Sequence, residues 1–278
     1  MQTAEQMLRT GRRGTVHEFA MAVGDFRASG GKLGLAWTLA WHDVVSRYRG
    51  SILGPFWITL SMLVMVLGLG ILYAELQHIS LITFMPFVAL GIVFWGMISL
   101  VIIEGCDTFV HASGMLSQTS LPMFTFLWRT VLRNLVTLGH HLIIIVGVLI
   151  WFGYWRILNL PLAIAGLLLT VINISWISLG VAITSARFRD IPQIVTSVMQ
   201  FSMFMTPVFW IPSSRSPVMR VVLEFNPFFY MLDSIRSPLL GQQPQALSYL
   251  VLIIMAVLGW SLTFSAFALT RRRIVHYL

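Results

Sequence analysis

The sequence predicts an all-α integral membrane protein with six transmembrane helices. Of its 278 residues, 57% are hydrophobic and only 10% are charged, whereas soluble domains carry about a quarter charged residues. The mean hydropathy is +0.84. Six apolar stretches approach or exceed the roughly 20 residues that a spanning helix needs. They cover residues 53–74, 81–103, 131–152, 160–183, 194–211 and 247–269.

Composition also excludes some features from the prediction. The single cysteine, Cys106, excludes an intrachain disulfide framework. Residues 1–30 contain four arginines but no apolar core of a signal peptide. We therefore expect a cytoplasmic N-terminal tail over 1–30 and one transmembrane domain over 31–278. The net charge of +8 is expected to report membrane topology and not a nucleic-acid partner.

The positive charges predict the orientation. Six spans would place both termini on the same side of the membrane. Only four of the 18 lysines and arginines then fall on the opposite side, namely Arg156, Arg215, Arg220 and Arg236. By the positive-inside rule, both termini are expected to be cytoplasmic.

The segment before the first span predicts an amphipathic helix that leads into an elbow. In KLGLAWTLAWHDVVSRYR, apolar residues recur on one helical face, and Trp37 and Trp41 suit the headgroup layer. A soluble helix packed on another protein surface is the alternative, and the two are compatible. The next residues, RYRGSILGPFW, contain a break followed by proline in the first turn of a new helix. The predicted elbow consists of Gly50, Leu53, Gly54 and Pro55.

Two cytoplasmic loops are candidate docking surfaces for a soluble partner. The first is EGCDTFVHASGMLSQTSLP, residues 104–122, in which Glu104 and Asp107 share a helical face. A solvated or partner-facing role fits these two acids better than catalysis. The second loop, ARFRDIPQ, places Arg187 and Arg189 before a helix start. Here a topological anchor with an N-terminal cap competes with docking.

The fifth span carries a polar stripe that includes Gln200 and Met203 among aromatic residues. Such a stripe faces either other helices, through hydrogen bonds, or a water-filled path in which rings stack on sugars. After it, two short apolar stretches at 218–225 and 228–240 are bounded by prolines. They predict interfacial or re-entrant helices on the outer side, which must be buried in protein or line a cavity.

Missing motifs narrow the function. The chain has no phosphate-binding loop of the G-x-x-x-x-G-K-[ST] type and no metal-binding motif. Its spans lack the mid-membrane acids that an ion-coupled flippase needs, and a membrane glycosyltransferase would need acids or a metal motif. His140 and His141 are expected to pack or hydrogen-bond. Arg129 and Arg133 either snorkel to the headgroups or contact an anionic lipid-linked substrate.

Several motifs in combination resemble one family. These are RYRGSILGPFW before span one, EGC after span two, RFRDIPQ before span five, TPVFW at its end and NPFFYMLDSIRSPLLGQ before span six. They resemble the type-2 ABC transporter permeases that export polysaccharides, in particular the O-antigen (Wzm) permeases of lipopolysaccharide biosynthesis. Capsule and teichoic-acid exporters are relatives. The resemblance covers residues 35–278.

This resemblance implies a homodimer in the bacterial inner membrane, bound to two Wzt-like ATPase subunits that hold ATP-Mg. The chain itself would be no enzyme and would carry no cofactor. It would move undecaprenyl-diphosphate-linked O-antigen from cytoplasm to periplasm, or another lipid-linked glycan. The residues expected to meet substrate or line the channel are Arg47, Arg49, Trp57, Gln200, Met203, Phe204, Phe209 and Trp210. Those expected to couple to the ATPase are Glu104, Asp107, His111, Met115, Arg187, Arg189 and Asp190.

Overall fold

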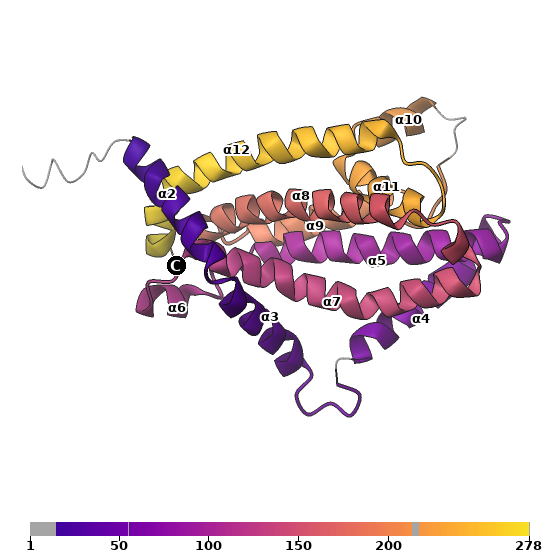
Figure 1. Cartoon of the computed structure of the whole chain (residues 1–278), viewed down its shortest axis with the longest axis horizontal. Coiled ribbons are helices and arrows are strands. Elements are labelled where there is room, and N and C mark those ends of the chain that lie inside the picture. Colours follow the sequence, from indigo (N-terminus) through magenta and orange to yellow (C-terminus); the bar gives the residue numbers. More distant parts are fainter. Residues whose placement is uncertain (1–14, 55, 213–216, 278) are drawn as a thin grey trace, which may run out of the picture.

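The computed structural model describes residues 15–54, 56–212 and 217–277, and this part of the chain is helical with no β-strand. Most of the long helices lie side by side along one axis, and α2 and α3 run obliquely to them (Figure 1). The elements are α2 (Thr15–Gly30), α3 (Leu33–Arg47), α4 (Phe56–Leu76), α5 (Leu81–Gly105), α6 (Ser113–Gln118), α7 (Met123–Trp151), the 3-10 turn η1 (Tyr154–Arg156), α8 (Leu160–Arg187), α9 (Ile191–Met205), α10 (Pro217–Glu224), α11 (Pro227–Leu239) and α12 (Ala246–Tyr277).

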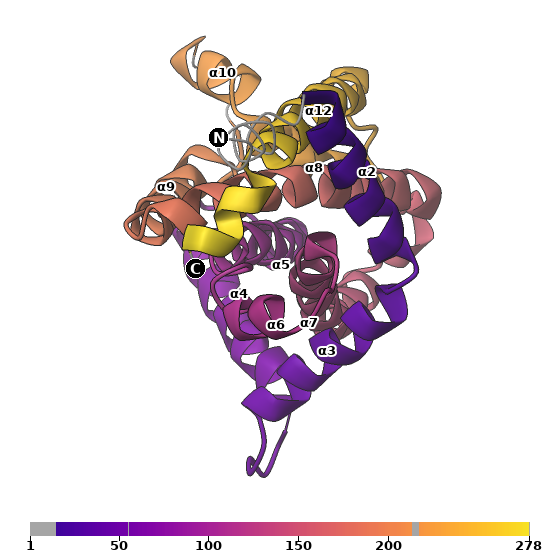
Figure 2. The same ribbon diagram turned by 90° about the vertical axis from the view of Figure 1, so that its left-hand side faces the viewer.

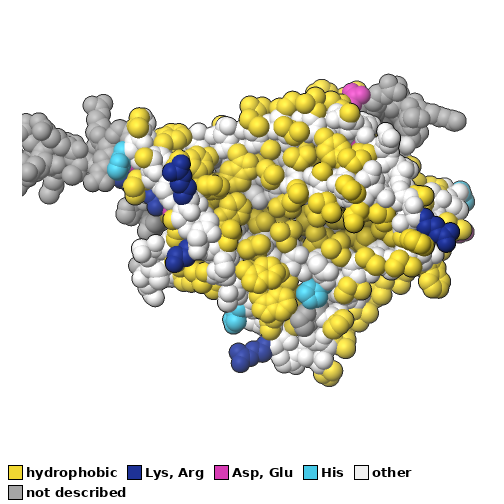
Figure 3. All heavy atoms as spheres, viewed as in Figure 1, with side chains coloured by type: hydrophobic (Ala, Val, Ile, Leu, Met, Phe, Trp, Pro, Cys, Tyr) yellow, Lys and Arg dark blue, Asp and Glu magenta, His cyan; other side chains and the backbone are white. Residues whose placement is uncertain are grey.

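Five of the described helices are long and apolar enough to cross a membrane, namely α4, α5, α7, α8 and α12. Each lies over one predicted span. The predicted span 194–211 corresponds to α9, a helix of 15 residues that ends at Met205. Such a helix is roughly 22 Å long, against about 30 Å for the hydrocarbon core. The six-span count therefore stays a prediction. Hydrophobic side chains cover the middle of the face in Figure 3, and most of the charged ones lie towards its edges.

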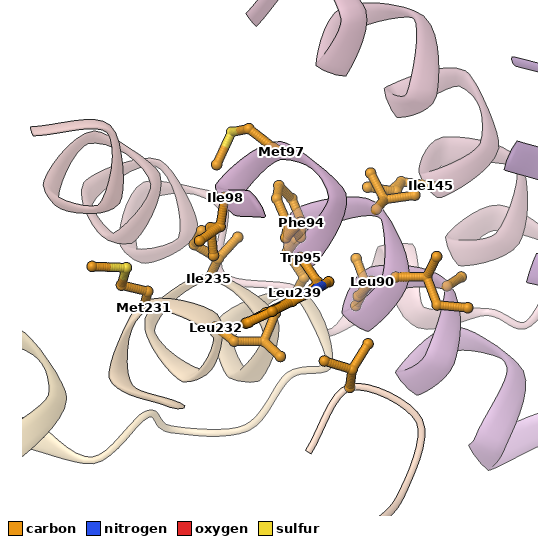
Figure 4. Packing of buried hydrophobic residues seen from close by; sticks show 14 of the residues in the cluster. Leu90, Phe94, Trp95, Met97, Ile98, Ile145, Met231, Leu232, Ile235 and Leu239 are labelled. Carbon is orange, nitrogen blue, oxygen red and sulfur yellow. The ribbon is translucent and has the colours of Figure 1, made fainter. Parts of the chain in front are cut away.

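Helix α5 forms the centre of the bundle. Of its spanning window, 78% is buried, against 17% for α4. Figure 4 shows Trp95 and Ile98 of α5 close to Ile235 and Leu239 of α11. The backbone of the α9–α10 connection also approaches α5 closely, because a side chain at Gly91 would collide with the carbonyl of Val208. Small residues permit such close helix contacts in membranes.

Part of the predicted N-terminal tail is helical, and its cytoplasmic location stays a prediction. Residues 15–30 form helix α2, which packs against α12 and α7; residues 1–14 lie outside the described part of the chain. Helix α3 follows where the amphipathic helix was predicted. It buries Ala36, Ala40 and Val44 against α7 and exposes Trp37 and Trp41, whose rings stack 6.4 Å apart. The short side chains of Ala36 and Ala40 on this face allow α3 to pack closely against α7.

Two short helices fill the connection between α9 and α12, as the two short apolar stretches predicted. Helix α11 lies inside the protein: every residue from Phe229 to Leu239 is buried. The side chain of Asn226 begins this helix by accepting a hydrogen bond from the Phe228 amide at 3.0 Å. This burial in protein is what a re-entrant helix requires, although the position of α11 in a membrane stays a prediction.

Candidate functional site

A largely apolar groove of about 260 Å³ lies between α4, α5 and α9. It contains two of the predicted channel residues on α9, Gln200 and Met203, together with Phe209. Trp95, Ser99 and Gln200 are its side chains with hydrogen-bonding groups, and four methionines supply adaptable walls. The lining residues are Met62, Met65, Leu69, Ile92, Trp95, Gly96, Ser99, Ile103, Met199, Gln200, Met203, Val208 and Phe209.

The other predicted channel residues lie around this groove or apart from it. Phe204 is 56% exposed and meets Phe209 edge-on at 5.9 Å. The Trp210 indole donates to the Phe204 carbonyl at 3.1 Å. Trp57, at the start of α4, is exposed and does not line the groove. The aromatic rings of Phe204 and Phe209 therefore lie in or next to the groove, whereas Trp57 lies outside it.

The non-helical segment after α9 is held by three side chains, one from beyond the end of α4 and two from α11 and its N-cap. Arg236 of α11 donates through Nη1 to the Pro207 carbonyl at 2.6 Å, and its guanidinium lies over the Phe87 ring of α5. Beyond the end of α4, the Gln77 amide donates to the Phe209 carbonyl at 3.2 Å. Asn226 donates to Thr206 Oγ1 at 2.9 Å. Irregular backbone at membrane depth needs such internal partners.

A charged network joins α3, α5 and α7. The Arg129 guanidinium donates to both oxygens of Asp43 at 2.8 and 2.6 Å. Arg133 pairs with Glu104 at 2.7 Å and reaches Asp43 at 3.4 Å. Asn134 Nδ2 also donates to Glu104 at 2.7 Å, and Arg47 approaches the same carboxylate at 3.4 Å. Bidentate pairs of this kind fix both distance and orientation.

The charge balance of this network keeps Asp43 ionised. Burial raises the pKa of the Asp43 carboxyl, but the hydrogen bonds and charge of Arg129, together with Arg133, outweigh it and lower the pKa below the usual 3.8. The arginines that were expected to snorkel or to meet substrate are thus engaged by acids of the same chain. Asp43 and Asn134 were not among the predicted site residues.

The elbow between α3 and α4 projects away from the bundle (Figure 1). Gly50 and Gly54 have φ angles of 85° and 54°, a region that favours glycine. Arg49 and Leu53 are exposed, and the Arg47 side chain is 59% exposed despite its contact with Glu104. Pro55 lies outside the described residues. The two glycines allow the chain to reverse direction here.

The end of the bundle with the C-terminal turns of α12, here called the arginine-rich end, brings together the two predicted docking loops (Figure 2). Asp107 and Arg189 line a cavity of about 220 Å³ with Ser113, Ser185 and Tyr277. The Arg187 guanidinium lies 5.0 Å from the centre of the Phe188 ring and 5.9 Å from that of Tyr277. The second loop and the last turns of α12 contribute Arg187, Arg189, Arg271, Arg272 and Arg273 to this end.

The remaining predicted coupling residues divide into two groups. His111 and Asp190 are exposed in these loops, and Met115 of α6 is half-buried. Glu104 instead turns into the α3–α7 network, where its carboxylate is engaged by the chain itself. Tyr277 was missed, because nothing in the sequence links the chain's end to the loops.

No group of three or more histidine, cysteine, aspartate or glutamate side chains within residues 15–54, 56–212 and 217–277 is placed to hold a metal ion. His140 Nδ1 lies 2.9 Å from the Val136 carbonyl, and His141 is buried. Both histidines are thus accommodated by helix packing.

Comparisons with known proteins found two similarities. The family described as "ABC-2 type transporter" matches residues 34–240. The chain is also 23% identical over 211 residues to the O-antigen export system permease protein RfbA of Myxococcus xanthus. That match covers 73% of this chain and 79% of the relative.

Proposed function

Because the chain belongs to the ABC-2 type transporter family, we propose that it is the membrane permease of an ATP-driven exporter of lipid-linked polysaccharide. The substrate class follows from its similarity to an O-antigen export permease, with undecaprenyl-diphosphate-linked O-antigen as the specific proposal. A separate ATPase subunit supplies the energy, since this chain has no phosphate-binding loop. Both termini are cytoplasmic in this proposal, and the polysaccharide moves outward across the bacterial inner membrane.

The observation that carries the proposal is the path of helix α5. Five of its residues between Ile92 and Ile103 line the groove, and its C-terminal end enters the predicted docking loop of residues 104–122. Helix α5 packs against α4, α7, α8 and α9, so in this proposal a shift of α5 is transmitted to the helices around the groove. A push on the docking loop by an ATPase subunit is therefore delivered to the groove wall.

A second copy of the chain completes the path in this proposal. Helix α4 exposes most of its apolar surface, and α9 exposes Phe201 and Phe204 beside the groove. If two copies of the chain paired through these exposed faces of α4 and α9, their two grooves would face each other across the axis of the dimer. Aromatic rings there would stack on sugar faces, and the exposed Arg47 and Arg49 at the elbow would attract the diphosphate.

Narrowing the groove tests this proposal. Replacing Met203 by tryptophan is expected to reduce ATP-dependent export roughly tenfold or more, equivalent to about 1.4 kcal/mol against translocation. ATP hydrolysis by the complex should continue, because the docking surface is untouched. Export is measured in proteoliposomes with lipid-linked polysaccharide extracted from the source cells.

The matched control is Leu168→Trp on α8, an exposed apolar position that lines neither the groove nor the docking cavity. Equal export by the Met203→Trp and Leu168→Trp proteins would show that the polysaccharide does not pass through the groove. A selective loss in the first would support it.

A further inference from the structure

Helix α2 precedes the region matched by the family, residues 34–240, yet it carries one of the most buried acids of the chain. The Asp25 side chain is 2% exposed. Its two oxygens accept hydrogen bonds from the amides of Met123 and Phe124, both at 3.1 Å. These amides form the first turn of α7, where the helix has no partner for them and where a negative charge is favoured. Asp25 thus caps α7 from a separate helix.

The same carboxylate also binds the last span. Arg271 of α12 donates through Nη2 to Asp25 Oδ1 at 3.0 Å. Three helices that are far apart in sequence, α2, α7 and α12, therefore meet at one side chain. Asp25 is the shared partner, since Arg271 and the two amides all bond to it.

Neighbouring contacts make this joint rigid. The Trp128 indole of α7 donates to Ser29 Oγ of α2 at 3.1 Å. Phe26 of α2 meets Phe124 edge-on at 5.2 Å and Trp260 of α12 at 6.5 Å. Aromatic contacts of this geometry favour one arrangement of the rings. The three helices are consequently held in a fixed relation around Asp25.

The joint lies directly beside the docking loop, because Met123, the first residue of α7, follows the loop of residues 104–122. We propose that Asp25 is a positioning residue for export, which ties the exit of the docking loop to α12 so that its movement reaches α7 and α12 together. This inference rests on the proposed function. Without the carboxylate, the first turn of α7 would fray and absorb the movement locally.

Three variants separate capping from ion pairing. Asp25→Ala removes both interactions and is expected to lower the polysaccharide exported per ATP hydrolysed by roughly 5- to 10-fold. Asp25→Asn keeps one acceptor oxygen for the two α7 amides and places an NH2 group against the other amide, so it should lose less than Asp25→Ala. Arg271→Gln removes only the ion pair and leaves both carboxylate oxygens to cap α7, so it should lose the least of the three. The control is Glu18→Gln on the same helix, which removes only the pair with the half-exposed Arg272 and should leave this ratio unchanged.

The readouts are export of lipid-linked polysaccharide from the source cells and ATP hydrolysis by the same proteoliposomes, with the permease in complex with its ATPase. Hydrogen exchange at residues 123–126 should rise most in Asp25→Ala, rise less in Asp25→Asn and stay low in Arg271→Gln. A purely structural role would lower the melting temperature and leave export per ATP at the wild-type value, which would overturn the inference. If the wild-type complex exports nothing on adding ATP, the proposed function fails, and this role fails with it.

Discussion

Replacing Arg236 by methionine is expected to destabilise the protein by about 3 kcal/mol and to lower its melting midpoint by roughly 6–12 °C. Arg236 is 4% exposed, and its guanidinium donates to the Pro207 carbonyl at 2.6 Å. Methionine leaves that carbonyl buried without this donor and removes the cation that lies 3.8 Å from the Phe87 ring centre. It also takes the positive charge away from the buried Asp233, which accepts from Ser237 and Ser248.

The measurement is thermal unfolding of the purified protein in detergent, followed by tryptophan fluorescence. Arg236→Lys keeps the charge but offers no planar fork, so its midpoint should lie between those of the methionine variant and the wild type. Arg156→Met is the control, since Arg156 is exposed and rests on the Trp155 ring at 5.1 Å. Equal midpoints for the Arg156→Met and Arg236→Met proteins would mean that Arg236 does not hold the α9–α10 segment.

Replacing Asp43 by asparagine should release α3 from the bundle. Its carboxylate accepts two hydrogen bonds from Arg129 and one from Arg133, and the paired side chains are only 16–21% exposed. We expect a loss of about 2–3 kcal/mol, between the values for exposed and for buried pairs. Hydrogen exchange across residues 33–47 should accelerate roughly 30- to 150-fold. Exchange in α8 should not change.

A charge exchange provides the matched test of this pair. Asp43→Arg combined with Arg129→Asp should recover part of the protection that each single variant loses, since the partners exchange places. His42→Ala, at the exposed neighbouring position, should leave exchange at the wild-type level. Exchange in α3 that stays slow in Asp43→Asn would show that apolar packing alone holds this helix.

The pH dependence of α3 docking follows from the lowered pKa of Asp43. A carboxyl with a depressed pKa in the folded state stabilises that state above its usual value of 3.8 and loses this contribution as the pH falls through the lower, folded-state pKa. The pair is therefore complete at both pH 7 and pH 5, and acidification within that range should leave α3 attached.

Much of the fold could be predicted from hydropathy, because lipid requires long apolar helices. Helix α5 begins at Leu81, as predicted, and α8 at Leu160. Helix α7 begins earlier than predicted, at Met123. Its first turns carry Arg129 and Arg133, and pairing with Asp43 and Glu104 supports them where hydropathy falls. The mean hydropathy of a stretch of sequence contains no information about ion-pair partners on other helices.

The site was less accessible to sequence reasoning. Gln200 and Met203 lie on one surface of α9, as their spacing along the helix predicts, whereas Phe209 reaches the same groove from beyond the end of α9. Their role in a channel stays a prediction. The roles of Asp25 and Arg236 depend on contacts with residues 98 and 29 positions away. Arg236 was assigned to the outer side as a topological charge, and its contact with Pro207 could only be found once α11 was placed inside the bundle.

Transport by the reconstituted complex tests the central claim most directly. The permease and its co-purified ATPase subunit are placed in proteoliposomes with lipid-linked polysaccharide from the source cells, and the glycan exposed on the opposite face is measured. The account predicts that glycan appears there only when ATP and Mg²⁺ are present on the side of the arginine-rich end. Transfer driven by a proton or sodium gradient without ATP would contradict it, as would the absence of any ATP-dependent transfer.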